Sequence, residues 1–312
     1  MTARRPLPYF LAKGAFATSR AGEHGISRSR MRAADLETPF RGVRSAGLDL
    51  GDLVQRCRAA EVFMDDGEAY SHSTALRLWG APLPAQFGAT GAALHIGTPG
   101  ATRRRRVGVI GHRLAPGTPM RLSPDGLRTV APATAWCQFA SQRDDLSDDE
   151  MLVALVAVAD CLITGRRTKG IRDDPACTPE EMRAAVIAHG SGRGARMLAA
   201  ALSLMRVGVD SPKETELRLL LHRAGVAEPT IGHIIPTRLG PLTPDLAYPA
   251  KRVLIEYEGD AHRENRRRWR GDFERVRAFQ QAGWTVIRVN ADDLTDEARR
   301  NALIAQLRLL LA

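Results

Sequence analysis

A helix with one apolar stripe is the clearest feature of the hydrophobic pattern. Leu217, Leu220 and Leu221 recur at helical spacing. The preceding residues 211–214 (SPKE) place serine at the N-cap, proline at the first helical position and glutamate at the third, which is typical of a helix start. Glu214 therefore has two open interpretations: it is a partner of the cap, or it is an acid presented by the first turn.

Short apolar runs after this helix predict a sheet. Residues 244–248 (PDLAY) and 253–259 (VLIEYEG) are strand candidates, and the second becomes acidic at its end. Residues 272–281 predict a helix that ends at a glycine, and residues 284–289 (WTVIRV) predict a buried strand. We therefore expect an α/β domain over residues 206–312, closed by an amphipathic helix.

The middle segment, residues 51–205, is expected to be mixed α/β at first and helical later. Short strand-like runs at 93–96 and 107–110 flank four consecutive arginines at 103–106. These arginines could contact phosphate, although a solvated loop is the commoner outcome of such a run. From residue 133 the pattern becomes helical, and residues 151–163 predict an apolar core helix.

The first fifty residues predict a small, winged-helix-like DNA-binding unit. Two short helices, at 16–25 and 27–36, are joined by a turn, and Ser27 caps the second. Residues 38–44 follow as an extended segment, as a wing would. The alternative is a plain helical hairpin with a solvated arginine face. The arginines that crowd the second helix are the candidate nucleic-acid contacts: Arg28, Arg30 and Arg32.

Charge and cysteine content narrow the class of protein. The net charge of +10 and the pI of about 10.2 favour a polyanionic partner, although an arginine-rich genome would also produce them. The four cysteines are widely spaced without a C-x-x-C pair, which argues against a zinc clamp or a disulfide framework. The N-terminus lacks an apolar signal core, and the longest apolar run is too short to span a bilayer. We expect a reduced, cytoplasmic protein that does not associate with membranes.

The acidic end of the 253–259 strand carries the candidate chemistry. Glu256 and Glu258 share one face of a strand. If the strand that contains Asp245 pairs with it, three carboxylates converge, and their mutual repulsion favours a bound cation. Carboxylate oxygens suit Mg²⁺ or Mn²⁺, and such an ion can activate water for phosphodiester hydrolysis. The alternative is an acidic strand end that runs into solvent.

A basic segment follows the acidic strand. Arginines interleaved with an aromatic residue suit a phosphate backbone and stacking on sugars or bases, and a charged surface segment is the alternative. In the helix after it, Asp272, Arg275 and Arg277 either face the acidic site or form surface ion pairs. The candidate nucleic-acid contacts of the segment are Arg263, Arg266, Arg267, Arg268, Trp269 and Arg270.

The order of these motifs resembles the PD-(D/E)XK nuclease superfamily. The resemblance runs from residue 211 to about 294 and rests on SPKETELR, TPDLAYP, VLIEYEGDAH, DFERVRAFQQAGWTVIRV and ADDL. Within the superfamily, the chain is most similar to the very short patch repair (Vsr-like) endonucleases and their bacterial relatives. The resemblance implies a restriction-endonuclease-like α/β fold with a central mixed sheet.

The same resemblance implies roles for individual residues. Asp245 and Glu256 match the metal-binding carboxylates, and Glu214 matches the acid of the first helix. His262 matches a histidine that acts as a general base or faces the phosphate. The third motif position, which is usually lysine and commonly aspartate in this branch, is Glu258 here. This departure bears on catalytic competence more than on the fold.

Residues 10–200 resemble the AbiEi-type antitoxin and regulator proteins, in which a winged helix precedes a larger mixed domain. The resemblance rests on the N-terminal unit and on the segments SHSTALRLWG and PATAWCQFA. It implies DNA binding without chemistry, and it leaves open a toxin or other protein partner. The sequence thus supports two hypotheses: a DNA-binding, metal-dependent endonuclease, or a regulator in which an inactive nuclease fold only binds DNA.

Overall fold

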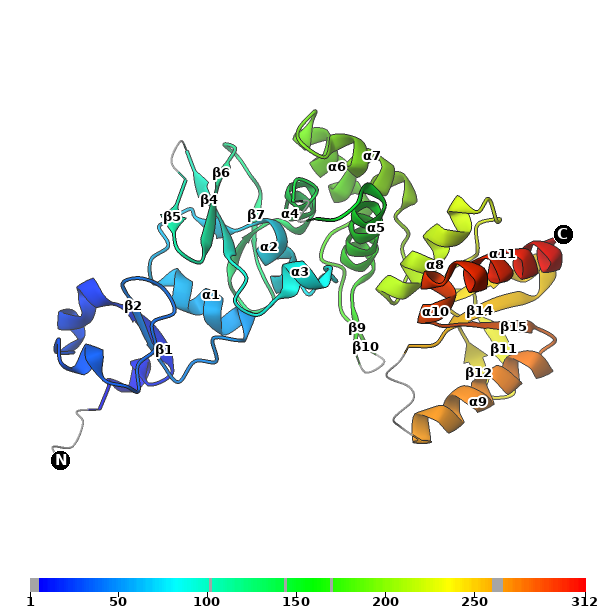
Figure 1. Ribbon diagram of the computed structural model, residues 1–312, viewed down its shortest axis with the longest axis horizontal. Helices are drawn as coiled ribbons and strands as arrows, with labels where there is room; N and C mark the ends of the chain where they lie inside the picture. Colours follow the sequence, from blue (N-terminus) through cyan, green and yellow to red (C-terminus); the bar gives the residue numbers. More distant parts are fainter. Residues whose placement is uncertain (1–5, 101–102, 143–144, 169–170, 260–265) are drawn as a thin grey trace. The chain divides into compact units, whose positions relative to one another are not determined.

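The computed structural model describes residues 6–100, 103–142, 145–168, 171–259 and 266–312, and for residues 266–270 it describes the backbone alone. The chain is mixed α/β, as the sequence predicted. Packing divides it into two units (Figure 1). Unit 1 comprises Met1–Asp145 and Glu180–Ala195, and unit 2 comprises Leu146–Pro179 and Arg196–Ala312. No helix among the described residues combines the length and apolarity needed to cross a membrane.

Unit 1 begins with a two-stranded sheet and short turns of 3-10 helix. The α-helices predicted over residues 16–36 were wrong, because residues 14–17 are taken up by a strand and Gly25, at φ +65°, ends the following turn. Ser27 still caps the next turn, since its Oγ accepts a hydrogen bond from the Arg30 N–H (3.2 Å). The elements are η1 (Tyr9–Leu11), β1 (Gly14–Ala17), η2 (Thr18–His24), η3 (Arg30–Arg32) and β2 (Val43–Ala46).

The rest of unit 1 is built on a six-stranded mixed sheet with the order β5-β6-β4-β3-β8-β7. β4 runs parallel to β6 and β3 parallel to β8, whereas the other neighbours are antiparallel. The elements are α1 (Leu53–Glu61), β3 (Ala69–Tyr70), α2 (His72–Leu78), α3 (Ala85–Gly88), β4 (Leu94–Pro99), β5 (Arg105–Arg106), β6 (Val109–Leu114), β7 (Met120–Leu122), β8 (Arg128–Val130), α4 (Pro132–Phe139) and α6 (Pro179–His189).

Unit 2 joins a long helix from the middle of the sequence to the C-terminal region. α5 begins with a capping box formed by Ser147 and Glu150, and it packs against α8. The packing units therefore divide the chain differently from the boundaries at 50 and 205 that the sequence suggested. The helices are α5 (Asp148–Thr164), α7 (Ala195–Leu204), α8 (Pro212–Arg223), η4 (Pro249–Lys251), α9 (Arg266–Gln281), α10 (Ala291–Thr295) and α11 (Glu297–Leu311). The strands are β9 (Arg167–Thr168), β10 (Ile171–Arg172), β11 (Ile235–Thr237), β12 (Gly240–Leu242), β13 (Leu246–Tyr248), β14 (Val253–Tyr257) and β15 (Thr285–Val289).

A three-stranded sheet, β13-β14-β15, forms the centre of unit 2. β14 pairs antiparallel with β13 and parallel with β15, as a crossover through α9 requires. Alternate residues of the strands face opposite layers. Ile255 packs with Leu217 of α8 and Leu307 of α11, whereas Leu254 packs with Phe279 of α9. Helices thus cover both faces of the sheet (Figure 1).

A buried ion pair fixes α8 against α5. Arg218 Nη2 lies 3.0 Å from Asp160 Oδ2, and only 2% and 1% of the two side chains are exposed. Thr215 Oγ1 donates to the same carboxylate oxygen (2.8 Å), and the Arg206 N–H donates to the other oxygen (2.6 Å). Burial raises the pKa of Asp160, and the Arg218 charge opposes this shift. The carboxylate is therefore an anchor between the two helices.

We predict that Arg218→Met destabilises the protein by about 3 kcal/mol, because it leaves the buried Asp160 carboxylate without its cation. The change would be measured by urea denaturation. Lys213→Met in the same helix removes an exposed partner of Glu216 and is expected to change stability by less than about 0.5 kcal/mol. Equal effects of the two substitutions would contradict the anchoring role.

Candidate functional site

Asp245, the residue before β13, lies opposite Glu256 of the neighbouring strand β14. β13 and β14 pair in a register that includes Ala247↔Leu254, and continuing this register brings Asp245 beside Glu256. Alternate residues of a strand face the same side of the sheet, so Glu256 lies on the same side as Leu254, and Asp245 opposite it does too. Leu254 packs against Phe279, so this is the side that α9 covers. The pairing on which the predicted convergence of the carboxylates depended is thus present.

Glu214 approaches Asp245 from α8. Ser211 Oγ accepts a hydrogen bond from the Glu214 N–H (3.2 Å), which confirms the predicted N-cap. The Glu214 carboxylate also accepts a hydrogen bond on Oε2 from the Asp210 N–H (3.0 Å). The two interpretations of Glu214 are thus compatible, since it orders the helix start and also belongs to the acidic cluster.

Burial and like charge hold protons on these carboxyl groups. Burial, together with the nearby Glu256 charge, raises the pKa of Asp245 to about 7. Burial and the Asp245 charge raise the pKa of Glu214 to about 8. A hydrogen bond from the Tyr257 N–H to Asp245 Oδ2 (2.7 Å) acts in the opposite direction. Asp245 and Glu214 therefore titrate together near neutral pH, where a cation could replace a proton.

Arg275 of α9 is the cation that faces Glu256. Its Nε donates to Glu256 Oε2 (3.0 Å) and its Nη2 to Oε1 (3.1 Å), a two-pronged arrangement. Nη2 also donates to the Thr243 carbonyl, in the segment that leads to Asp245. Of the two alternatives for this helix, Arg275 therefore faces the acidic site. Arg277 instead lies over the ring of Phe273, 5.7 Å from its centroid.

Glu258 has its own cationic partner. It forms an ion pair with Arg288 of β15, and the parallel register places Arg288 beside Glu256. Lys251 lies beyond the other end of β14, where its Nζ donates to the Ala312 carbonyl (2.7 Å). Among the described residues, arginines from α9 and β15 thus contact the acidic cluster.

An open cleft of about 650 Å³ lies at these carboxylates. Asp245, Glu256 and Glu258 line it, together with Arg275 and Arg288. The lining also includes two charged residues from segments distant in sequence, Arg167 of β9 and Asp210, whose charged atoms are 2.6 Å apart. Sequence reasoning missed both, because no local pattern indicates that the β9–β10 hairpin reaches this site.

The remaining residues that the sequence predicted to bind nucleic acid or to assist catalysis do not line the carboxylate cleft among the described residues. Arg30 pairs with Asp35 through two hydrogen bonds (2.9 and 2.7 Å), which leaves Arg28 and Arg32 as the exposed candidates of the N-terminal unit. His262 and Arg263 lie outside the described residues. The helix α9 begins earlier than residue 272, so its first turns contain Arg266, Arg267, Arg268, Trp269 and Arg270.

The donor set of the cleft suits a divalent cation. Carboxylate oxygens are the ligands that Mg²⁺ and Mn²⁺ prefer. Each Glu256 oxygen accepts one hydrogen bond from Arg275, and a carboxylate oxygen has room for a second interaction. Asp245 and Glu256 could therefore hold a cation between them. The cleft can accordingly combine two acidic ligands with arginines that would meet an anionic substrate.

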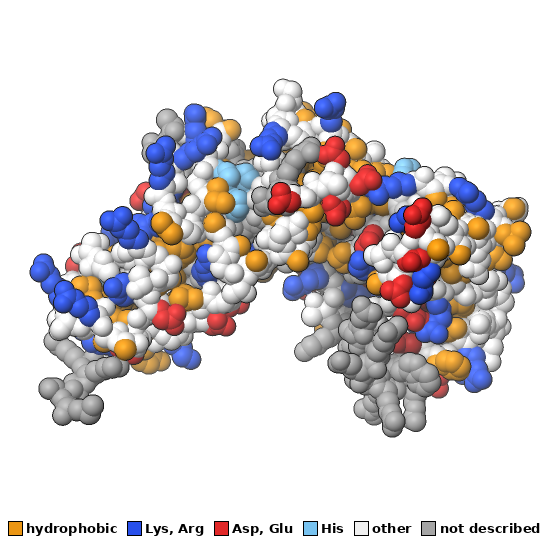
Figure 2. Space-filling view, viewed as in Figure 1, with side chains coloured by type: hydrophobic (Ala, Val, Ile, Leu, Met, Phe, Trp, Pro, Cys, Tyr) orange, Lys and Arg blue, Asp and Glu red, His pale blue; other side chains and the backbone are white. Residues whose placement is uncertain are grey.

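A second cluster of possible ligands lies in unit 1. His72, His95 and His112 each offer a ring nitrogen, and these atoms all lie within 4.8 Å of one another. Figure 2 shows histidine side chains grouped on this unit. Burial lowers the pKa of His72 to about 2 and those of His95 and His112 to about 4, with further contributions from neighbouring charges, so the rings are neutral at pH 7.

The orientation of these rings favours a hydrogen-bond network over metal ligation. Gln142 Oε1 accepts from the Ser73 N–H (2.9 Å), which directs the Gln142 amide nitrogen to His95 Nε2 (3.0 Å). The His95 proton then lies on Nδ1, which donates to His112 Nε2 (2.8 Å). The rings of His72 and His112 are stacked 3.6 Å apart. Stacked rings direct their in-plane lone pairs side by side, whereas ligands of one ion must converge.

We predict that stability falls as the pH rises from about 5 to about 8, because the folded carboxyl groups keep protons that the unfolded chain has released. The pKa values of Asp245 and Glu214 are raised to about 7 and 8. Glu214→Gln removes one of these groups and should reduce the loss by on the order of 2 kcal/mol. Urea denaturation at several pH values measures it. Glu216→Gln serves as the matched control, and parallel profiles for all three proteins would refute the assignment.

Comparisons with known proteins leave the family open. No protein-family model matches the chain, and no solved structure matches it. The chain is similar to two proteins of Mycobacterium tuberculosis strains, MT2308 and Rv2248, both described as uncharacterized. Each is 27% identical over 255 residues, which cover 80% of this chain and 84% of the relative. The similarity thus extends over both units and carries no functional description.

Proposed function

We propose that the chain is a DNA-binding protein whose C-terminal region, residues 206–312, is a metal-dependent endonuclease domain. This domain would belong to the Vsr-like branch of the PD-(D/E)XK superfamily and have its restriction-endonuclease-like fold. A small DNA-binding unit at 1–50, built on β1, β2 and 3-10 turns, and a mixed middle domain at 51–205 would precede it. The observation that carries the proposal is the placement of Asp245 opposite Glu256 at an open cleft lined by arginines.

In this proposal Asp245 and Glu256 hold Mg²⁺ or Mn²⁺. The ion would supply charge neutralisation at the scissile phosphate and a more acidic water. Glu214, buried behind the pair, would hold or release a proton as Asp245 changes its charge. His262, which lies outside the described residues, is the proposed general base or phosphate-facing group. The basic segment at 263–270 would contact the DNA backbone.

The substitution of glutamate for lysine at the third motif position has a local compensation. Glu258 is neutralised by Arg288, and Arg288 also neighbours Glu256 in the sheet register. Arg275 supplies a second guanidinium on the same side of the cleft. Arginine binds phosphate oxygens through two donors, so these residues can stabilise the charge that the lysine would have met.

A second candidate function is a regulator of the AbiEi type in which the nuclease fold only binds DNA. The two-pronged Arg275 contact favours it, because a guanidinium that bonds both Glu256 oxygens competes with a metal ion for them. This candidate requires binding to a specific duplex without metal dependence. A toxin or other protein could then be its partner.

We predict that the purified protein nicks supercoiled plasmid DNA in the presence of Mg²⁺ or Mn²⁺. Asp245→Asn and Glu256→Gln should each lower the nicking rate by about 100-fold or more, because metal stabilisation of the transition state is worth several kcal/mol. Gel electrophoresis of relaxed and linear products measures the rate.

The matched control is Glu216→Gln, which removes a carboxylate of α8 that pairs with Lys213 outside the cleft. Nicking that survives Asp245→Asn would contradict the metal site. Metal-independent duplex binding without any nicking would favour the regulator instead.

A further inference from the structure

The four consecutive arginines at 103–106 divide into two pairs with opposite roles. Arg103 and Arg105 are exposed, whereas Arg104 and Arg106 are partly buried, as expected for an extended segment whose side chains alternate between faces. The last two form β5, the edge strand of the six-stranded sheet. The run is therefore not the solvated loop that such a run more often forms.

The inner pair anchors the segment. Arg104 Nε lies 2.9 Å from both oxygens of Glu68, and its Nη2 lies 2.8 Å from Asp65 Oδ2. Only 2% of the Glu68 side chain is exposed, and Thr98 Oγ1 also donates to it (2.7 Å). Burial alone would raise the pKa of Glu68, but these hydrogen bonds bring it below its usual value. Glu68 is thus an ionised, buried anchor for Arg104.

Arg106 is held by different contacts. Its guanidinium carbon lies 4.0 Å from the centroid of the Phe63 ring, and its Nη1 donates to the Arg41 carbonyl. This bond ties β5 to the segment before β2. The backbone of the run is therefore fixed at two successive inward positions.

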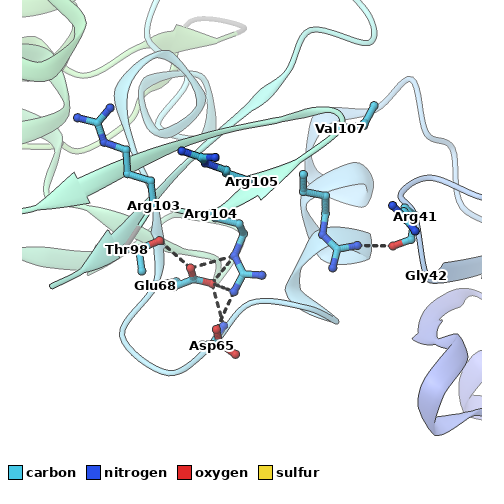
Figure 3. Close-up of a pocket in the computed structure, with 10 residues that line it drawn as sticks. Arg41, Gly42, Asp65, Glu68, Thr98, Arg103, Arg104, Arg105 and Val107 are labelled. Atoms are coloured by element: carbon cyan, nitrogen blue, oxygen red, sulfur yellow. Dashed lines mark hydrogen bonds and ion pairs between the residues drawn. The ribbon is translucent and has the colours of Figure 1, made fainter. Parts of the chain in front are cut away.

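The outer pair has no such partners. Among the residues that the structure describes, the side chains of Arg103 and Arg105 make no hydrogen bond or ion pair, and neither does the side chain of Arg41. Figure 3 shows Arg104 turned toward Glu68 and Asp65 while Arg103 and Arg105 point away from them. All of these residues line one cleft of about 810 Å³. Its two carboxylates are engaged by Arg104, so its five arginines leave an excess of positive charge.

We propose that this cleft binds the phosphodiester backbone of nucleic acid through Arg41, Arg103 and Arg105. Guanidinium groups match phosphate geometry, and a fixed backbone lowers the entropic cost of binding. Figure 2 shows Lys and Arg side chains gathered over this part of unit 1. The site lies in unit 1, so it does not depend on the carboxylate cleft of unit 2 being catalytic.

The experiment measures binding of a fluorescent DNA duplex to the full chain by anisotropy at several salt concentrations, with Asp245→Asn present throughout to prevent cleavage. Arg103→Ala combined with Arg105→Ala should weaken binding by about tenfold or more at low salt. The slope of log affinity against log salt should become shallower by about two, because each of the two arginines neutralises one phosphate.

The control combines Arg128→Ala with Arg193→Ala, which removes the same charge from exposed positions of unit 1 outside the cleft. Its salt slope should equal that of the parent. An equal change in both double variants, or none in the first, would overturn the proposal. Labelled polyglutamate is the second probe: if it binds as tightly as the duplex and loses affinity equally in the first variant, the ligand is an acidic protein instead.

Discussion

Repulsion among carboxylates is the constraint around which unit 2 is organised. Asp245, the residue before β13, lies opposite Glu256 of β14 when the register is continued, and Glu214 is buried near them. Like charges at such positions destabilise a sheet, and they do so more strongly where solvent is excluded. The surrounding structure compensates with guanidinium groups from three directions: Arg275 from α9, Arg288 from β15, and Arg167 at the neighbouring Asp210. A cleft that keeps such a costly arrangement is a strong candidate for chemistry.

The second constraint is the position of α8. This helix carries Glu214 in its first turn, so its placement sets the distance from Glu214 to the sheet. Its apolar stripe packs on β13 and β14 through Leu217 and Leu221, but a stripe alone permits sliding. The Asp160–Arg218 pair defines the position along the helix, because a buried charge tolerates few alternative partners. α5 thereby contributes to the site without a residue in the cleft.

The sequence predicted the local parts of unit 2 well and its long-range contacts poorly. The cap at Ser211 and the strand at 253–257 follow from period and capping rules, which act over a few residues. The pairing of that strand with β13 was a condition rather than a prediction, because these rules do not determine which strands are neighbours. The two-pronged contact of Arg275 with Glu256 depends on how α9 lies across the sheet, and period alone left Arg275 with two alternatives. The position of Arg167 at the cleft could not be predicted from the sequence, because strands of two residues have no recognisable periodicity. In residues 16–36, helical spacing was misleading because pairing with β2 draws the start of the segment into a strand.

The alternation of β5 makes its turn as important as its side chains. Arg106 pairs with Val109, so only Val107 and Gly108 connect β5 to β6. Gly108 has φ +79°, and a Cβ there would meet the Phe40 ring at 3.4 Å. One residue added to or removed from this turn would shift the strand by one position and exchange its two faces. The arginines that now face Glu68 and Phe63 would turn to solvent, and the outer pair would turn inward. A change in the length of this turn would therefore disturb the structure of the hairpin more than a substitution of either exposed arginine.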